Sequence, residues 1–186
     1  MKKIIAFAGS NSRESINKKL VVFTANKIVD VSIKVLDLNE YQLPIYGIDH
    51  ENEIGIPDNA KKFFDEVKSA DGIILSLAEH NGAYTAVFKN IFDWMSRIDG
   101  KLWNHKPMFL MSTSTGGRGG RSVLEIAKAR FPFMGGNIVA EFSLPFFGKN
   151  YSYEGLLDSA LEDSLNFEIS KFKASAIIAL TLSDIV

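Results

Sequence analysis

The chain has 186 residues, a net charge of −1 and 46% apolar residues, which fits one globular domain, since domains usually hold roughly 100–200 residues. This apolar content excludes a disordered chain, and the near-zero charge lacks the field that drives non-specific nucleic-acid binding. Without cysteine, disulfides, thiolate metal sites and a cysteine nucleophile are excluded. Any redox chemistry therefore needs a bound cofactor.

Two lysines precede a short apolar run at the N-terminus, in the manner of a signal peptide. The run ends at Gly9, whereas the apolar part of a signal peptide needs ~7–15 residues. No stretch reaches the ~20 apolar residues of a membrane span. We therefore expect a buried first strand and a cytoplasmic protein that binds neither membrane nor nucleic acid.

Short apolar runs alternate with longer segments of helical period, which predicts a parallel sheet covered by helices on both faces. Five strands are expected over residues 3–7, 33–38, 72–77, 107–111 and 138–142. The expected helices cover residues 17–29, 87–98, 120–131 and 154–173, and a further one has Pro57 in its first turn. This is the count of an α/β, flavodoxin-like doubly wound sheet with order 2-1-3-4-5, with a Rossmann dinucleotide domain as the alternative. We expect a single domain over residues 1–186.

Two segments do not fit this alternation. Residues 38–56 are too long for an ordinary connection and predict an ordered surface excursion that shapes a pocket wall or a subunit contact. Within it, residues 49–53 are interpreted as a solvated acidic loop rather than a metal site. In the tail, residues 177–180 are too apolar for solvent, so we expect them to return to the core or to pair with another subunit.

The loop after the first strand, residues 9–17, carries hydroxyls, an amide and a guanidinium. In open α/β sheets ligands bind outside the carboxyl ends of the strands, and a helix N-terminus with hydroxyl donors favours a phosphate. The alternative is a capped turn, with Ser15 or Asn17 as the N-cap. Gly9 is followed by no Gly-Lys pair and Asn11 replaces the second glycine of a dinucleotide motif, so a mononucleotide is favoured.

Two later loops carry glycine beside polar residues, over residues 77–84 and 112–120. Glycine lets the backbone approach a flat ligand closely, so this surface suits a planar heterocycle. The alternative for the second loop is a glycine-rich turn required only by the backbone conformation.

Taken together, three motifs resemble the NADPH-dependent FMN reductase family, whose flavodoxin-like members include quinone, chromate and azo-dye reductases. The likeness spans about residues 3–145. It rests on Gly9-Ser10 with Arg13 and Ser15-Ile16-Asn17, on Glu79-His80-Asn81-Gly82 with Lys89-Asn90 and Asp93-Trp94, and on Ser114-Thr115-Gly116-Gly117. The resemblance implies bound FMN, NADPH or NADH as electron donor, a small-molecule acceptor and a homodimer or homotetramer.

The same resemblance implies the cofactor-binding residues. Those at the FMN phosphate would be Ser10, Ser12, Arg13, Ser15 and Asn17, with Ile16 in the same loop. The flavin ring would lie beside Glu79, His80, Asn81 and Gly82. Its pyrimidine side or ribityl chain would contact Ser114, Thr115, Gly116 and Gly117. No metal ligand is expected, and no side chain is assigned a catalytic step, because flavin N5 accepts the hydride.

Two positions depart from the family's common Pro-Glu-Tyr-Asn-Gly motif, with Ala78 for proline and His80 for tyrosine. The prediction is an FMN-dependent NAD(P)H oxidoreductase that transfers hydride through FMN to a quinone, free flavin or similar acceptor. A flavodoxin-like electron carrier is a second hypothesis, although carriers that dock by charge bear acidic surfaces. A flavin-binding module without catalysis is a third, which His80 keeps open.

Overall fold

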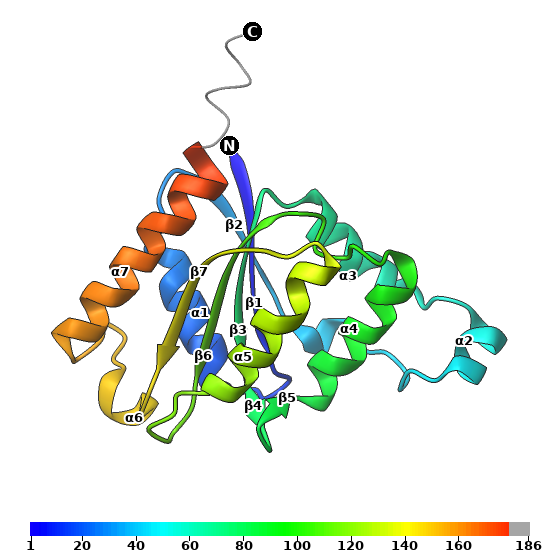
Figure 1. The fold of residues 1–186 in the computed structure, drawn as a ribbon, viewed down its shortest axis with the longest axis horizontal. Coiled ribbons are helices and arrows are strands. Elements are labelled where there is room, and N and C mark those ends of the chain that lie inside the picture. The colour runs from blue at the N-terminus through cyan, green and yellow to red at the C-terminus, as the bar shows by residue number, and fades with distance from the viewer. Residues whose placement is uncertain (179–186) are drawn as a thin grey trace, which may run out of the picture.

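A parallel five-stranded sheet forms the centre of the computed structural model, which describes residues 1–178 (Figure 1). The strands are β1 (Lys2–Gly9), β2 (Val31–Leu36), β3 (Gly72–Leu77), β6 (Pro107–Thr113) and β7 (Asn137–Leu144). Their order is β2-β1-β3-β6-β7, so the predicted order 2-1-3-4-5 is confirmed once the short hairpin β4–β5 is set aside. Because β1 and β3 are buried on both faces, they appear in the sequence as continuous apolar runs.

Helices cover both faces of the sheet, as predicted (Figure 1). One apolar cluster joins the sheet to α1 (Ile16–Asn26) and α7 (Ser159–Lys173). The other joins it to α3 (Asp58–Ser69), α4 (Ala86–Ile98) and α5 (Arg121–Arg130). Within the part of the chain that the structure describes, no helix is long and apolar enough to cross a membrane.

Helix boundaries differ from the sequence predictions where a cap decides them. Helix α1 begins at Ile16 because the Ser15 hydroxyl accepts the backbone N–H of Lys18. Pro57 is the N-cap of α3 and does not lie within its first turn. The last helix begins five positions later than residue 154, since the Asp158 carboxylate caps it, and the short helix α6 (Phe147–Asn150) was not predicted.

The excursion over residues 38–56 is ordered, as expected, and forms a 3-10 helix, η1 (Leu38–Glu40), and helix α2 (Ile48–Ile54). Its first part lines a cavity of about 320 Å³. Residues 49–53 are accessible to solvent, as expected, but the prediction of a loop is wrong, because they lie in α2. There Glu51 accepts hydrogen bonds from Tyr46 and Arg97.

The tail returns to the core as far as it is described. A π-helix, η3 (Ala174–Ile178), continues α7, Ala176 is buried in the same cluster as α1 and α7, and Ile177 packs against that cluster. Residues 179 and 180 of the apolar tail lie outside the described residues.

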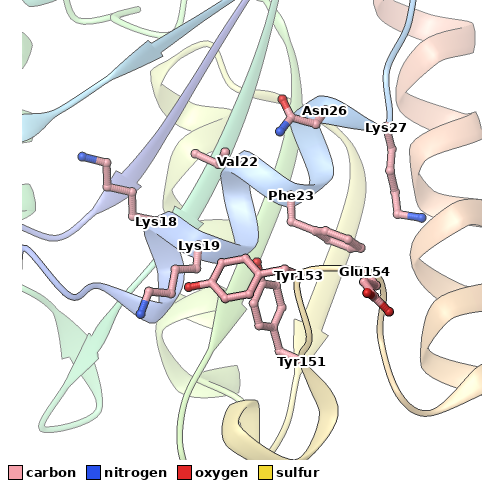
Figure 2. Close-up of a pocket in the computed structure, with 9 residues that line it drawn as sticks. All are labelled: Lys18, Lys19, Val22, Phe23, Asn26, Lys27, Tyr151, Tyr153 and Glu154. Atoms are coloured by element: carbon pink, nitrogen blue, oxygen red, sulfur yellow. The ribbon is translucent and has the colours of Figure 1, made fainter.

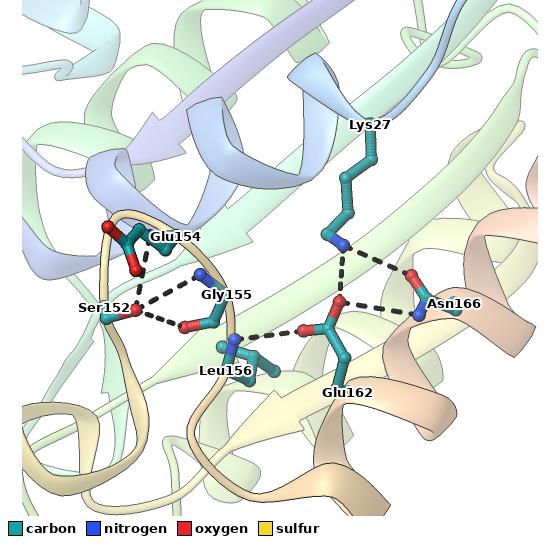
Figure 3. A network of polar contacts seen from close by, with 7 residues as sticks. All are labelled: Lys27, Ser152, Glu154, Gly155, Leu156, Glu162 and Asn166. Carbon is teal, nitrogen blue, oxygen red and sulfur yellow. Dashed lines mark hydrogen bonds and ion pairs between the residues drawn. The ribbon is translucent and has the colours of Figure 1, made fainter.

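A polar network ties α1 to α7 and to the loop that precedes α7 (Figure 3). The Lys27 ammonium donates to one oxygen of Glu162, and the other oxygen accepts the Leu156 N–H at 3.0 Å. Within the loop, the Ser152 hydroxyl donates to the Gly155 carbonyl at 2.9 Å. These contacts hold residues 152–156 in one conformation against both helices.

Acid should weaken this network, because Glu162 must stay ionised to accept both bonds. Burial acts to raise the pKa of Glu162, but the bonds from Lys27 and Leu156 outweigh it and hold the pKa below its ordinary value of 4.5. A carboxyl with a lowered pKa in the folded state stabilises the fold above the unfolded pKa, and this stability is lost as the pH falls through the folded value.

We expect Glu162→Gln to lower the free energy of unfolding by about 1–2 kcal/mol at pH 7. The difference from the unmodified protein should shrink below pH 4, where that protein loses the same contribution. Urea unfolding at pH 7 and below pH 4 measures the two differences. The matched control is Glu154→Gln, which changes an exposed carboxylate in the loop that Glu162 holds. Equal destabilisation by Glu162→Gln at both pH values would contradict the assignment.

Candidate functional site

Three loops meet at the carboxyl edge of the sheet, where β1, β3 and β6 end, and enclose a cavity of about 270 Å³. This edge is at the bottom of the view in Figure 1. The cavity is lined by Ser10, Ser12, Glu14, Ser15, Ile16, Asn17, Ala78, Glu79, His80, Thr113, Ser114 and Thr115. Its place beside β1 and β3 is the point where the strand order reverses, which is where ligands bind in such sheets.

Most of the predicted cofactor-binding residues come together in this cavity. Five of them do not line it and are exposed: Arg13, Asn81, Gly82, Gly116 and Gly117. Glu14, Ala78 and Thr113 also line the cavity and were not predicted. All three are direct neighbours of predicted residues in the chain, which is the signal that could have found them.

The loop after β1 leaves hydrogen-bond donors free. The Ser15 N–H donates to the Ser12 carbonyl at 3.2 Å and the Ser15 hydroxyl caps α1, so the turn is capped as the alternative reading predicted. Over residues 1–178, the N–H groups of Ile16 and Asn17 have no acceptor. Unpaired donors at the positive end of a helix are the features that bind an anion, so the cap and the anion-site prediction are compatible.

Asn17 is buried and its side chain is committed to the protein itself. Its Oδ1 accepts the Ser76 hydroxyl at 2.8 Å and the Thr113 N–H at 3.0 Å, while its Nδ2 donates to the Thr113 carbonyl at 3.1 Å. The amide therefore joins α1 to β3 and β6. It leaves the backbone N–H of Asn17, rather than the side chain, as the donor available to a ligand.

Residues 79–84 form a hairpin and not the loop that the sequence analysis assumed. Strands β4 (Glu79–His80) and β5 (Ala83–Tyr84) pair antiparallel, with Asn81 at φ 52° and Gly82 at φ 77° between them. Two successive positive φ angles are those of a type I′ turn, for which Asn-Gly is the favoured pair. The signal was thus present in the sequence.

The hairpin is fixed in place by Glu79. Its carboxylate accepts the N–H of Val123 at 3.1 Å, which satisfies one free donor in the first turn of α5. His80 follows on the exposed end of the hairpin and still lines the cavity. The hairpin therefore presents His80 at the mouth of the site from a rigid support.

The glycine-rich loop is shaped mainly by its own packing. Gly119 and Gly120 have φ of +60° and +76°, and a Cβ on Gly120 would lie 2.9 Å from the Ser112 side chain. The Phe146 ring fills the space beside Gly117, 2.8 Å from where a Cβ would be. The backbone conformation therefore accounts for Gly119 and Gly120, and contact with the Phe146 ring accounts for Gly117, which leaves Gly116 as the glycine of this loop that is open to a flat ligand.

Phe146 braces this loop at a strained backbone position, with φ 46°. Its N–H donates to the Gly116 carbonyl and the next N–H, of Phe147, donates to the Ser114 carbonyl, both at 3.0 Å. A non-glycine residue in the left-handed region costs energy and is kept only where its surroundings fix it. The two bonds explain how the end of β7 holds the third wall of the cavity.

The fold is that of a flavodoxin-like α/β protein, with its cavity at the position where such folds bind mononucleotides. A family model for NADPH-dependent FMN reductases matches residues 2–148. The chain belongs to that family.

Several named proteins are similar to this chain in sequence. A 2-hydroxy-1,4-benzoquinone reductase from Burkholderia sp is 34% identical over 119 residues, which cover 63% of this chain and 63% of the relative. A quinone reductase from Escherichia coli strain K12 is 29% identical over 119 residues, which again cover 63% of this chain and 63% of the relative. The matched segment thus spans less than two thirds of the length of these relatives.

Among solved structures, the flavoenzyme NAD(P)H:(acceptor) oxidoreductase FerB from Paracoccus denitrificans superposes with a TM-score of 0.69. It is 20% identical, and the match covers 95% of this chain and 100% of FerB. An NADH:FMN oxidoreductase, EMOB, in its apo form gives 0.71 at 18% identity, covering 95% of this chain and 90% of EMOB. At these identities the structures establish the shared fold.

We expect Asn17→Ala to lower the free energy of unfolding by about 2–4 kcal/mol, because it leaves buried groups of Ser76 and Thr113 without partners. Urea denaturation measures the loss. Asn26→Ala, an exposed asparagine on the same helix, should change the stability by less than about 0.5 kcal/mol. Equal effects of the two variants would show that the Asn17 amide does not hold the three elements together.

Proposed function

We propose that this protein is an FMN-dependent NAD(P)H oxidoreductase that reduces a quinone, free flavin or similar small acceptor. The family of the chain and the names of its relatives support this. The observation that carries the proposal is the cavity at the carboxyl edge, where the unpaired N–H groups of Ile16 and Asn17 adjoin serine hydroxyls. That donor set suits a single phosphate group.

The residues present fit FMN. Hydroxyls of Ser10, Ser12 and Ser15 and the two free N–H groups of α1 would hold its phosphate, with about 0.3–1 kcal/mol from the helix dipole. Glu14 lines the same cavity, but its side chain is 86% exposed, so solvent and salt screen its negative charge. Arg13, exposed in the same loop, adds a positive charge nearby.

The β4–β5 hairpin and residues 114–116 would border the flavin ring, largely through backbone groups. When bound, FMN supplies the ring that accepts a hydride from the nicotinamide and returns two electrons to the acceptor. For a quinone, one NAD(P)H and one proton yield NAD(P)⁺ and the hydroquinone. The protein's own task would be to bind and orient, and the Asn17 and Glu79 hydrogen bonds support this by holding the cavity walls in place.

The proposal is tested by mixing the FMN-loaded protein with NADPH or NADH without oxygen, and then adding 1,4-benzoquinone. We expect the visible flavin absorbance to bleach with the nicotinamide and to return with the quinone, in repeated turnovers. Tight FMN binding without bleaching would favour a non-catalytic module. Bleaching only after a partner reductase is added would favour an electron carrier.

We also propose that the protein assembles as a homodimer or homotetramer through the face formed by α4, α5 and η2 (Phe131–Met134). A cavity of about 630 Å³ opens there, and Phe133 and Ile126 on its wall are 71% and 38% exposed. The buried Tyr84 hydroxyl on the same wall has no partner within residues 1–178. Apolar side chains exposed together in this way mark an interaction surface.

A cytoplasmic location stays a prediction from the sequence.

Phe133→Asp is expected to convert the assembly to single chains of 20.6 kDa, because a charge would be buried against an apolar partner surface. Light scattering after gel filtration measures the mass. Phe167→Asp, which changes an aromatic side chain that is 64% exposed on α7, should leave the assembly intact. A single chain in the unmodified protein would refute the proposed assembly.

A further inference from the structure

Another cavity, a groove of about 510 Å³, lies further along α1, between this helix and residues 151–154 (Figure 2). Nothing in the proposed reaction uses it. Its size lies within the ~300–1,000 Å³ of small-molecule sites. It is lined by Lys18, Lys19, Val22, Phe23, Asn26, Lys27, Tyr151, Tyr153 and Glu154.

One wall of this groove is aromatic. The Tyr151 ring meets Phe23 at 5.7 Å and 80°, and meets Tyr153 at 5.8 Å and 72°. Phe147 stacks on Tyr151 at 4.5 Å and so fixes its orientation. Tyr153 is 81% exposed, which leaves its ring open to a ligand. Edge-to-face and offset contacts with such rings are favourable for another flat ring.

The aromatic wall is already held in place. Tyr153 and Glu154 lie in the loop that Ser152 and Glu162 fix by hydrogen bonds, and Lys27 connects Glu162 to α1 (Figure 3). A ligand would therefore meet a formed surface and would not have to order the loop, which lowers the free-energy cost of binding.

The charges of the groove favour an anion over a cation. Three lysines line it against one carboxylate, Glu154. Lys18 and Lys27 are committed to Asp37 and Glu162, whose side chains are largely covered. Lys19 differs, because its partner Glu14 has a side chain that is 86% exposed. An ion pair with so exposed a partner is worth little, so the Lys19 ammonium can exchange Glu14 for a ligand.

The position of Glu154 determines which end of the groove a negatively charged group of a ligand would occupy. Figure 2 shows the Lys19 ammonium on the side of the tyrosine rings, whereas Glu154 lies toward Phe23 and Lys27. A negative group at the Glu154 end would be repelled, so it belongs at the Lys19 end. With one exchangeable ammonium, a single negative charge is matched and a polyphosphate is not.

We propose that this groove binds a flat aromatic molecule that carries one negative charge, such as an aromatic carboxylate. The ring lies against Tyr151 and Tyr153, and the carboxylate pairs with Lys19. The site is separate from the cavity proposed for FMN, and the proposal does not depend on the redox function.

The test titrates 2-naphthoate into the FMN-loaded, ¹⁵N-labelled protein and follows amide chemical shifts. We expect saturable shifts over residues 18–27 and 151–154. Tyr153→Ala should raise the Kd about three- to tenfold, the range for one aromatic contact. Lys19→Gln should raise it about two- to fivefold, and 2-naphthalenemethanol, which has no charge, should bind more weakly than 2-naphthoate by the same factor.

Matched controls come from α7, where Lys171 lies over the exposed Phe167 ring at 5.8 Å, away from the groove. Phe167→Ala and Lys171→Gln should leave the Kd unchanged. Shifts confined to residues 10–17 and 78–82 would place the naphthoate in the other cavity and overturn the proposal. An equal Kd for the unmodified protein and Tyr153→Ala would overturn it as well, and the fold of each variant is checked by its amide spectrum.

Discussion

The site depends on one buried amide. Asn17 stands at the start of α1 and holds the hydroxyl of Ser76 and both backbone groups of Thr113. Buried polar groups of this kind must be fully paired, so the amide permits only one relative position of α1, β3 and β6. The free N–H groups of the first turn are thereby aimed at the place where the other two loops end.

The remaining walls are held by the same means, with side chains that hydrogen-bond to backbone groups outside their own strand. Glu79 ties the hairpin to α5, and Thr113 donates to the Leu144 carbonyl at 2.7 Å. The Ser112 hydroxyl donates to the Gly119 carbonyl, also at 2.7 Å. A cavity built in this way is in place before any ligand arrives, which is what a protein that positions a cofactor requires.

The sequence was sufficient for the sheet, because strands buried on both faces appear as apolar runs that are too short for a helix and that alternate with segments of helical period. It also located the three loops that meet, since parallel strands end at one edge. It could not show that Asn17 would turn its side chain inward, or that Phe146 would fill the space beside Gly117. Those contacts join residues about 30 to 100 positions apart, and local pattern carries no information on them.

Two further segments differ from their predictions, each for a different reason. Residues 79–84 were expected to form a loop, although the pair Asn81-Gly82 is typical of the type I′ turn of a hairpin. The acidic residues 49–53 suggested a loop, yet the carboxylate of Glu51 is neutralised by Arg97 at 2.9 Å and accepts the Tyr46 hydroxyl, so the segment forms a helix. Here a tertiary partner overrides a composition that is polar on its own.

Calorimetric titration with FMN and with riboflavin measures whether the loop after β1 holds a phosphate group. We expect FMN to bind at least about tenfold more tightly than riboflavin, as charge-assisted bonds to a phosphate would provide. Ser12→Asp should remove this advantage and leave the riboflavin affinity unchanged. Equal affinities for FMN and riboflavin in the unmodified protein would show that the loop holds no phosphate.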